Sequence, residues 1–308
     1  MCDATFTFGQ CGSHFLQCPS KRDFYRLPAK LQTLLTSKHI ALVHHVALGF
    51  ENSFLIAYRD RMGGDRIESQ GLPSELYDFV YAKNKTNLYA RDIPKLRVTL
   101  GPYNSSFFAH DQGAYLWMNL PPALLSAIQI RIKGGAWVDK PRIVALGADA
   151  NFLLITEKHA AVWDLRNYRT LNSMIEFSRT QERGIAEVHN VVLHPYRYQG
   201  FVAHSKNGTL LYENLPQPTT LAVTAMRDSV MRDTKEAARK RAQMEREGSS
   251  RPIIADMEIQ RRPSLNQHTE LRRQWTDRKE QIRKESKGLR LSLSLRISAG
   301  GVGFGFGK

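Results

Sequence analysis

Short stretches of alternating apolar and polar residues recur along the first 226 residues, each followed by a leucine-rich segment. The clearest copy has apolar runs at 96–101, 105–108 and 115–117, then Leu120-Pro121-Pro122 and aliphatic residues at helical spacing over 124–132. Alternation predicts half-buried strands. Proline suits the first turn of a helix, because its missing N–H has no partner there. Each copy is therefore predicted to form two or three strands and then a helix.

Two sets of marker residues show that the copies keep step. The glycine after the first strand stands at Gly9, Gly49, Gly101 and Gly147, with His194 in its place in the fifth copy, and the leucine before the helix is Leu27, Leu72, Leu120, Leu165 and Leu215. The first set is spaced by 40, 52, 46 and 47 residues, the second by 45, 48, 45 and 50. A unit of this size cannot bury its own apolar face, so we expect the five copies to stack. We expect the glycine to supply a positive φ in a tight turn, built differently at His194.

At this period the array resembles degenerate β-propeller repeats of the WD type, in which a Trp near the end of a strand packs between blades. Trp117 and Trp163 occupy comparable places, and Trp163-Asp164 contains the Trp-Asp dipeptide, but there is no Gly-His signature and a helix replaces the fourth strand. The chain is also similar to uncharacterised fungal proteins with this Gly, Ser-Phe, Trp and Leu-Pro repeat and a basic C-terminal tail. The resemblance implies a mainly β fold with helices, of about five β-β-(β)-α repeats. It does not fix the number of blades or whether the ring closes. An open array and a layered α/β sheet are therefore alternatives.

The chain divides by composition into four parts. Residues 1–226 form the repeat domain and residues 227–288 a basic, charged extension, expected to be helical or disordered. Residues 289–298 alternate strictly between aliphatic residues and Ser or Arg, which predicts an amphipathic strand that docks on a terminal blade or on another protein. Residues 299–308 are glycine-rich.

Charge and cysteine content limit the class of protein. The net charge is +15, of which residues 227–308 carry +9 from 20 Lys and Arg against 11 Asp and Glu. No apolar stretch is long enough to span a membrane, and no basic segment precedes an apolar run at the N-terminus. The chain has three cysteines, and an odd number without a secretory signal favours a reducing compartment. We expect an intracellular protein, cytoplasmic or nuclear.

Few residues suggest chemistry. Cys2, Cys11, His14 and Cys18 are soft ligands, but their spacing is not that of common zinc modules and His14 falls within a predicted strand, so ordinary structural roles are favoured over metal binding. No nucleotide-binding glycine pattern and no hydrolase or metalloprotease motif is present. We therefore expect no catalytic residues, no metal and no cofactor.

The basic extension holds the remaining candidates. Ser264 follows Arg261-Arg262-Pro263, which matches the preference of basophilic kinases, so Ser264 is a candidate phosphosite. Basic clusters that can contact phosphates or an acidic partner are Arg239-Lys240-Arg241, Arg272-Arg273 and Arg283-Lys284.

Three functional interpretations follow. The first is a non-catalytic scaffold that binds a protein partner through a surface of the repeat domain, with a basic regulatory tail. The alternative is nucleic-acid or ribonucleoprotein binding through the tail, although the acidic residues there halve its charge and Trp275 is its only aromatic residue before the glycine-rich end. The third, an enzyme with a site in a central channel, is disfavoured because no polar residue type recurs at one repeat position.

Overall fold

The computed structural model describes residues 2–248. The candidate residues Ser264, Arg272, Arg273, Arg283 and Lys284, the amphipathic strand 289–298 and the glycine-rich end lie outside this part of the chain. The fold is mixed, with 33% helix and 35% strand, so helices contribute more than the expected mainly β architecture implies.

Five three-stranded antiparallel sheets follow one another along the chain, each with its strands paired in sequence order. Sheet 1 comprises β1 (Thr5–Phe8), β2 (His14–Cys18) and β3 (Lys21–Tyr25), and sheet 2 comprises β4 (Ile40–Leu48), β5 (Phe54–Asp60) and β6 (Asp65–Gln70). Sheet 3 comprises β7 (Arg97–Leu100), β8 (Phe107–His110) and β9 (Tyr115–Met118), and sheet 4 comprises β12 (Pro141–Leu146), β13 (Phe152–Thr156) and β14 (Ala161–Asp164). Sheet 5 comprises β15 (Val188–Leu193), β16 (Phe201–Ser205) and β17 (Leu210–Glu213). Each predicted copy thus contains one sheet.

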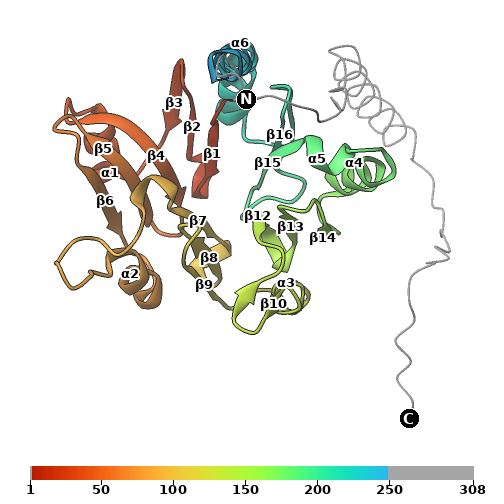
Figure 1. The fold of residues 1–308 in the computed structure, drawn as a ribbon, viewed down its shortest axis with the longest axis horizontal. Helices are drawn as coiled ribbons and strands as arrows, with labels where there is room; N and C mark the ends of the chain where they lie inside the picture. Colours follow the sequence, from red (N-terminus) through yellow and green to blue (C-terminus); the bar gives the residue numbers. More distant parts are fainter. Residues whose placement is uncertain (1, 249–308) are drawn as a thin grey trace.

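Every sheet is followed by a helix, and the helices lie on the outside (Figure 1). They are α1 (Ala29–Thr36), α2 (Ser74–Tyr81), α3 (Pro122–Gln129), α4 (Arg169–Thr180) with the short α5 (Gly184–Glu187), and α6 (Gln217–Gly248). Helix α3 ends before Ile132, which we expected to be helical but which pairs with Trp137 in a small hairpin of β10 (Ile132–Lys133) and β11 (Ala136–Trp137). The repeat unit is three strands and a helix.

The Leu-Pro pair sets the start of each helix. In α1 to α3 the proline is the N-cap, and its carbonyl accepts the first helical hydrogen bond, as from Gln32 N to Pro28 O at 2.9 Å. The fourth copy lacks this proline, but Tyr168 takes its place, since Asn172 N donates to Tyr168 O at 2.8 Å. Proline is therefore a preference at this position and not a requirement.

The marker glycines have a different role from the one we expected. Gly9, Gly101 and Gly147 have φ values of −117°, −83° and −119°, and the positive φ falls on residues after them, such as Asp149 at 51°. The expectation of a positive φ at the glycine was wrong, because the turn places its left-handed residues two and three positions later. What requires glycine is space: a Cβ atom on Gly49 would overlap Ser53 Oγ and Asn104 Oδ1.

Five apolar cores hold the sheets together, and each is shared by two sheets and the helix between them. The core of sheets 1 and 2 contains Phe15, Leu31, Leu48 and Phe54; that of sheets 2 and 3, Leu55, Leu76, Leu96 and Phe107; that of sheets 3 and 4, Phe108, Leu124, Phe152 and Leu154; and that of sheets 4 and 5, Leu153, Leu171, Ile175 and Phe201. The fifth core joins Val202 and Leu210 of sheet 5, Val223 and Met226 of α6, and Phe6, Phe8 and Leu16 of sheet 1. The last sheet therefore packs against the first.

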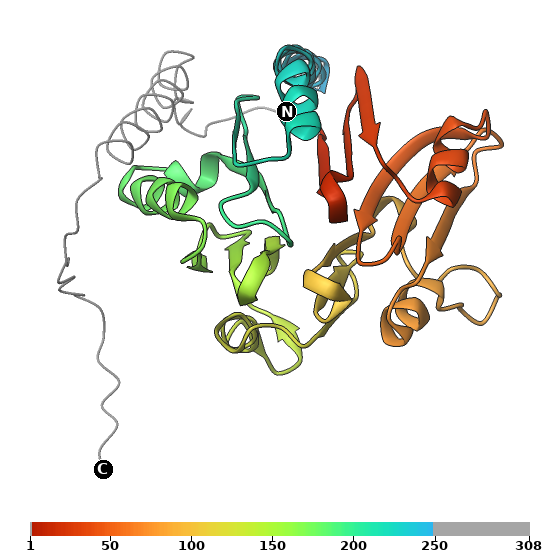
Figure 2. The same ribbon diagram turned by 180° about the vertical axis from the view of Figure 1, so that it is seen from behind.

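Helix α6 provides this last contact and then leaves the sheets. It runs without a break across the compositional boundary at 226, lying beside sheet 1 in both views (Figures 1 and 2). Asp233 accepts hydrogen bonds at 2.9 Å from the backbone N and from the Oγ of Ser20, and Thr234 is the last buried residue of the helix as far as Met244. The extension that the composition sets apart from residue 227 is thus helical and packed for its first two turns, and it is exposed from Lys235 to Met244 except at the half-buried Ala237.

The tight approach at the glycines gives a first prediction. Gly49→Ala forces a Cβ atom against Ser53 and Asn104, so the free energy of unfolding is expected to fall by about 1–3 kcal/mol. Urea unfolding followed by circular dichroism measures the change. The matched control is Gly113→Ala, where the nearest atom to the new Cβ, Asp111 Oδ1, lies at 3.5 Å. Equal stability of the two variants would contradict the role assigned to Gly49.

Candidate functional site

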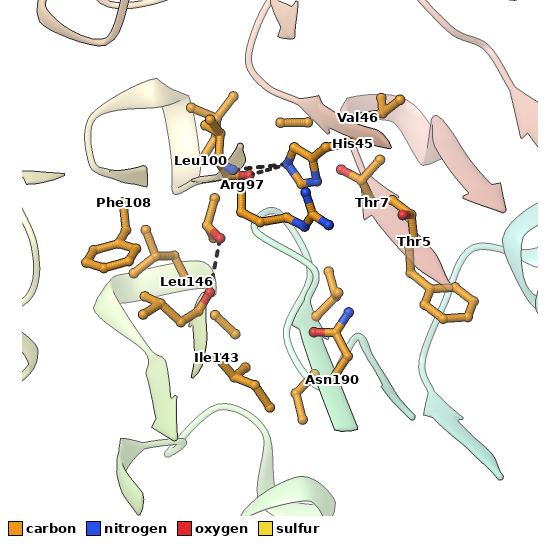
Figure 3. A pocket seen from close by; sticks show the side chains of 18 of the residues that line it. Thr5, Thr7, His45, Val46, Arg97, Leu100, Phe108, Ile143, Leu146 and Asn190 are labelled. Atoms are coloured by element: carbon orange, nitrogen blue, oxygen red, sulfur yellow. Dashed lines mark hydrogen bonds between the residues drawn. The ribbon is translucent and has the colours of Figure 1, made fainter. Parts of the chain in front are cut away.

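The first strands of all five sheets surround one pocket of about 320 Å³. Strands β1, β4, β7, β12 and β15 contribute most of the lining, and Figure 3 shows side chains from these strands converging on the opening. Because each sheet directs its first strand inward, residues that are far apart in the sequence meet here.

Side chains of successive first strands reach the backbone of the next strand. Leu48 N donates to Thr7 Oγ1 at 3.3 Å, and Thr99 Oγ1 donates to Val144 O at 3.0 Å. His45 Nε2 lies 2.9 Å from Val98 O and 3.1 Å from Val98 N. In each bond, the two residues stand a similar number of positions before the marker residue of their own sheet. The first strands therefore run in the same direction around the pocket.

The end of the pocket near the first turn of each sheet is apolar. One large apolar residue stands directly before each marker position, namely Phe8, Leu48, Leu100, Leu146 and Leu193. Beyond them, Tyr103 contacts Phe50 with ring centroids 5.1 Å apart and Tyr196 with centroids 5.8 Å apart. Turns from sheets 2, 3 and 5 are thereby joined at this end.

The opposite end of the first strands is polar and carries two arginines. Arg97 Nη1 donates to Pro94 O at 2.9 Å and to Leu96 O at 2.8 Å. Arg142 Nη1 donates to Val188 O at 2.7 Å, while its Nε is buried with no hydrogen-bond partner among the described residues. Asp3 is the single carboxylate among the residues that line the pocket, and within residues 2–248 neither arginine forms an ion pair within 4.0 Å.

Three histidines at the same end are uncharged near neutral pH. Burial lowers the pKa of His45 to about 3, and the neighbouring charge of Arg97 adds to the effect. Burial likewise lowers the pKa of His110 and of His189 to about 4. Apart from His44, whose ring is paired with Asp65, the charged residues that line the pocket are Arg97, Arg142 and Asp3, which leaves an excess of one positive charge.

One repeat position explains where these polar side chains come from. The residues four before the markers are Thr5, His45, Arg97, Ile143 and Asn190, and Figure 3 shows all five around the opening. No single residue type recurs at this position, which is polar in four copies but chemically varied, so the expectation that a site would repeat one residue type overlooked it. A comparison by polarity would have found it.

The residues that the sequence did single out lie elsewhere. Arg239, Lys240 and Arg241 are exposed on α6, beyond its last contact with sheet 1. Cys2 and Cys18 are buried, whereas Cys11 is exposed in the turn after β1.

His14 begins β2, as predicted, and is 1% exposed. Its Nδ1 lies 2.9 Å from Thr219 Oγ1 and its Nε2 lies 3.1 Å from Asp23 Oδ1. Both ring nitrogens thus have protein partners, and within residues 2–248 no group of three or more His, Cys, Asp or Glu side chains is placed to hold a metal ion.

Comparison of the chain with protein-family models, with curated proteins and with solved structures finds no match. Within residues 2–248, no helix has the length and apolar character needed to cross a bilayer. The function must therefore be argued from the geometry.

The buried histidines predict acid sensitivity. Burial lowers the pKa of His204, which is 1% exposed, to about 3, against about 6.5 in an unfolded chain. Between these values the unfolded chain binds a proton that the folded chain does not, so stability is lost as the pH falls below about 6.5. Both ring nitrogens of His204 lack a hydrogen-bond partner in the described part of the chain.

His204→Phe removes this titration and keeps an aromatic ring. We expect the loss of unfolding free energy between pH 7 and pH 5 to be about 2 kcal/mol smaller in the variant than in the natural chain. Urea unfolding at both pH values measures it, with substitution of the exposed His39 by Gln as the control. Identical pH dependence of the natural chain and His204→Phe would show that folding does not lower the pKa of His204.

Proposed function

We propose that the chain is a five-bladed β-propeller-like scaffold that binds a protein partner and does not catalyse a reaction. The observation that carries the proposal is the fifth core, in which sheet 5 and α6 pack against sheet 1. In this interpretation each sheet is a blade, and the helix after it fills the place of the fourth strand. Trp117 and Trp163 support it, since both stand third in the last strand of their sheet and pack against the core shared with the next sheet.

The exposed end of α6 is the part of this scaffold best suited to a partner. Arg239, Lys240 and Arg241 are exposed, and none of them forms an ion pair with another described residue. A helix that is polar on all sides gains little from its own chain, so its extension away from the sheets favours contact with another molecule. The charge favours an acidic protein surface or, as the alternative, nucleic-acid phosphates.

Ring closure predicts the effect of a core truncation. Met226→Ala deletes a fully buried side chain of α6 between sheets 5 and 1, and we expect the free energy of unfolding to fall by about 2–5 kcal/mol. In a closed ring the loss is global, so amide exchange should accelerate in all five sheets. The control is Leu124→Ala in the core of sheets 3 and 4, which should give the same pattern. Faster exchange confined to β1–β3 after Met226→Ala would instead indicate an open array.

The partner class is tested by affinity capture with the full chain, with and without nuclease. For a protein partner we expect one protein to be retained after nuclease treatment and to be lost from a variant in which three basic residues are replaced by Gln: Arg239, Lys240 and Arg241. The control has the same change in charge at three exposed positions elsewhere: Lys38, Arg61 and Lys85. Capture that vanishes with nuclease and falls steeply with salt would support the nucleic-acid alternative instead. If the triple variant captures the partner as well as the natural chain does, the exposed end of α6 is not the binding surface.

A further inference from the structure

The central pocket contains an arginine that uses two of its five N–H donors within the described chain. Within residues 2–248, both hydrogen bonds of the Arg97 guanidinium are donated by Nη1, to the carbonyl oxygens of Pro94 and Leu96. The Nε and Nη2 donors have no partner among the described residues. These two N–H groups form one edge of the guanidinium, and such an edge matches the two oxygens of a carboxylate or phosphate. Arg97 is thus fixed in place by one nitrogen and free at the others.

The surroundings of Arg97 offer further donors. His110 is its cross-strand neighbour, and His110 Nδ1 is buried with no hydrogen-bond partner within residues 2–248. Figure 3 shows the Arg97 guanidinium beside the His45 ring, with the Asn190 amide directed toward the same space. Arg142 adds positive charge from the neighbouring strand. The Arg97 side chain reaches solvent, but buried donors such as His110 Nδ1 and Arg142 Nε cost stability unless something pairs with them.

Asp3 is the one negatively charged residue among those that line the pocket. It is exposed and attracts Arg97 electrostatically, but it lies beyond ion-pair distance, since within the described chain no carboxylate oxygen is within 4.0 Å of the guanidinium. The position next to Arg97 is therefore open to an anion from solution.

The far end of the pocket has the opposite character. The large apolar residues that precede the marker positions are each at most 6% exposed and line the same cavity, as do the aliphatic parts of Ala47 and Ala145. A volume of about 320 Å³ lies at the lower end of the range for small-molecule sites, roughly 300–1,000 Å³. One pocket thus joins a cationic end to an apolar end.

We propose that the central pocket binds a small amphipathic anion, whose carboxylate or phosphate group pairs with the Nε and Nη2 edge of Arg97 while its short apolar part lies toward Leu48, Leu100 and Leu146. His110 and Asn190 donate or accept further hydrogen bonds at the polar end. This site is independent of the exposed end of α6, so the scaffold proposal and this proposal fail separately.

Isothermal titration of the full chain with hexanoate, hexyl phosphate, hexanol and hexylammonium tests the proposal. We expect hexanoate or hexyl phosphate to bind at least about tenfold more tightly than hexanol, because only the anions pair with Arg97, and hexylammonium to bind more weakly still. The stronger of the two anions identifies the headgroup. Equal affinity for hexanol and for both anions, or no binding of either anion at concentrations up to about 10 mM, would overturn the proposal.

Substitution locates the site. Arg97→Gln should weaken anion binding at least about tenfold and leave hexanol unaffected, whereas Arg97→Lys, which keeps the charge but not the paired donors, should fall between Arg97→Gln and the natural chain. The matched control is Arg166→Gln, since Arg166 is 81% exposed and paired with Asp164 outside the pocket. Circular dichroism confirms folding of each variant. Two outcomes would exclude Arg97 as the anion contact. One is that folded Arg97→Gln or folded Arg97→Lys binds the anion as tightly as the natural chain does. The other is that Arg166→Gln loses as much anion affinity as Arg97→Gln.

Discussion

The constraint on which this structure depends is that no sheet can bury both of its faces alone. The middle strands show it directly: in β5, Leu55 and Ala57 belong to the core shared with sheet 3, while Phe54 and Ile56 belong to the core shared with sheet 1. Successive side chains of a strand point to opposite faces, so a strand that is buried on both faces must be apolar at every position. Each sheet is therefore stable only between two others, and the fifth core supplies the missing neighbour for both the first and the last sheet.

The same constraint explains what the sequence could predict. Markers spaced by 40 to 52 residues identified five copies, and each copy became three strands and a helix because its apolar residues must meet those of the next copy. The Leu-Pro pair located four helix starts, and Leu165 marked the fourth copy even though Tyr168 replaces the proline there. The alternation of apolar and polar residues within one strand depends only on that strand, so it can be predicted from the amino-acid sequence alone.

Features that depend on contacts between copies were not predictable in this way. Gly49 is required by Asn104 of the next sheet, a neighbour that is 55 residues away, and no local turn propensity contains that information. The packing of α6 beyond Arg227 depends on Ser20, whose backbone N and Oγ donate to Asp233 across the last junction. The pocket is the extreme case, because its lining comes from all five sheets and only the three-dimensional arrangement brings it together.

Polarity at the position four before the markers cannot be explained by packing. Ile143 shows that an aliphatic residue fits this position, and apolar side chains there would bury surface without the cost of desolvating a guanidinium or an imidazole. Three other copies nevertheless carry His45, Arg97 and Asn190, and Arg97 keeps two donors unpaired in the described chain. A fold stabilised by shared apolar cores therefore carries polar groups where five strands meet: Arg97 reaches solvent there, whereas His110 Nδ1 and Arg142 Nε are buried without a hydrogen-bond partner in the described chain. These polar groups are the ones that the proposed anion would pair with.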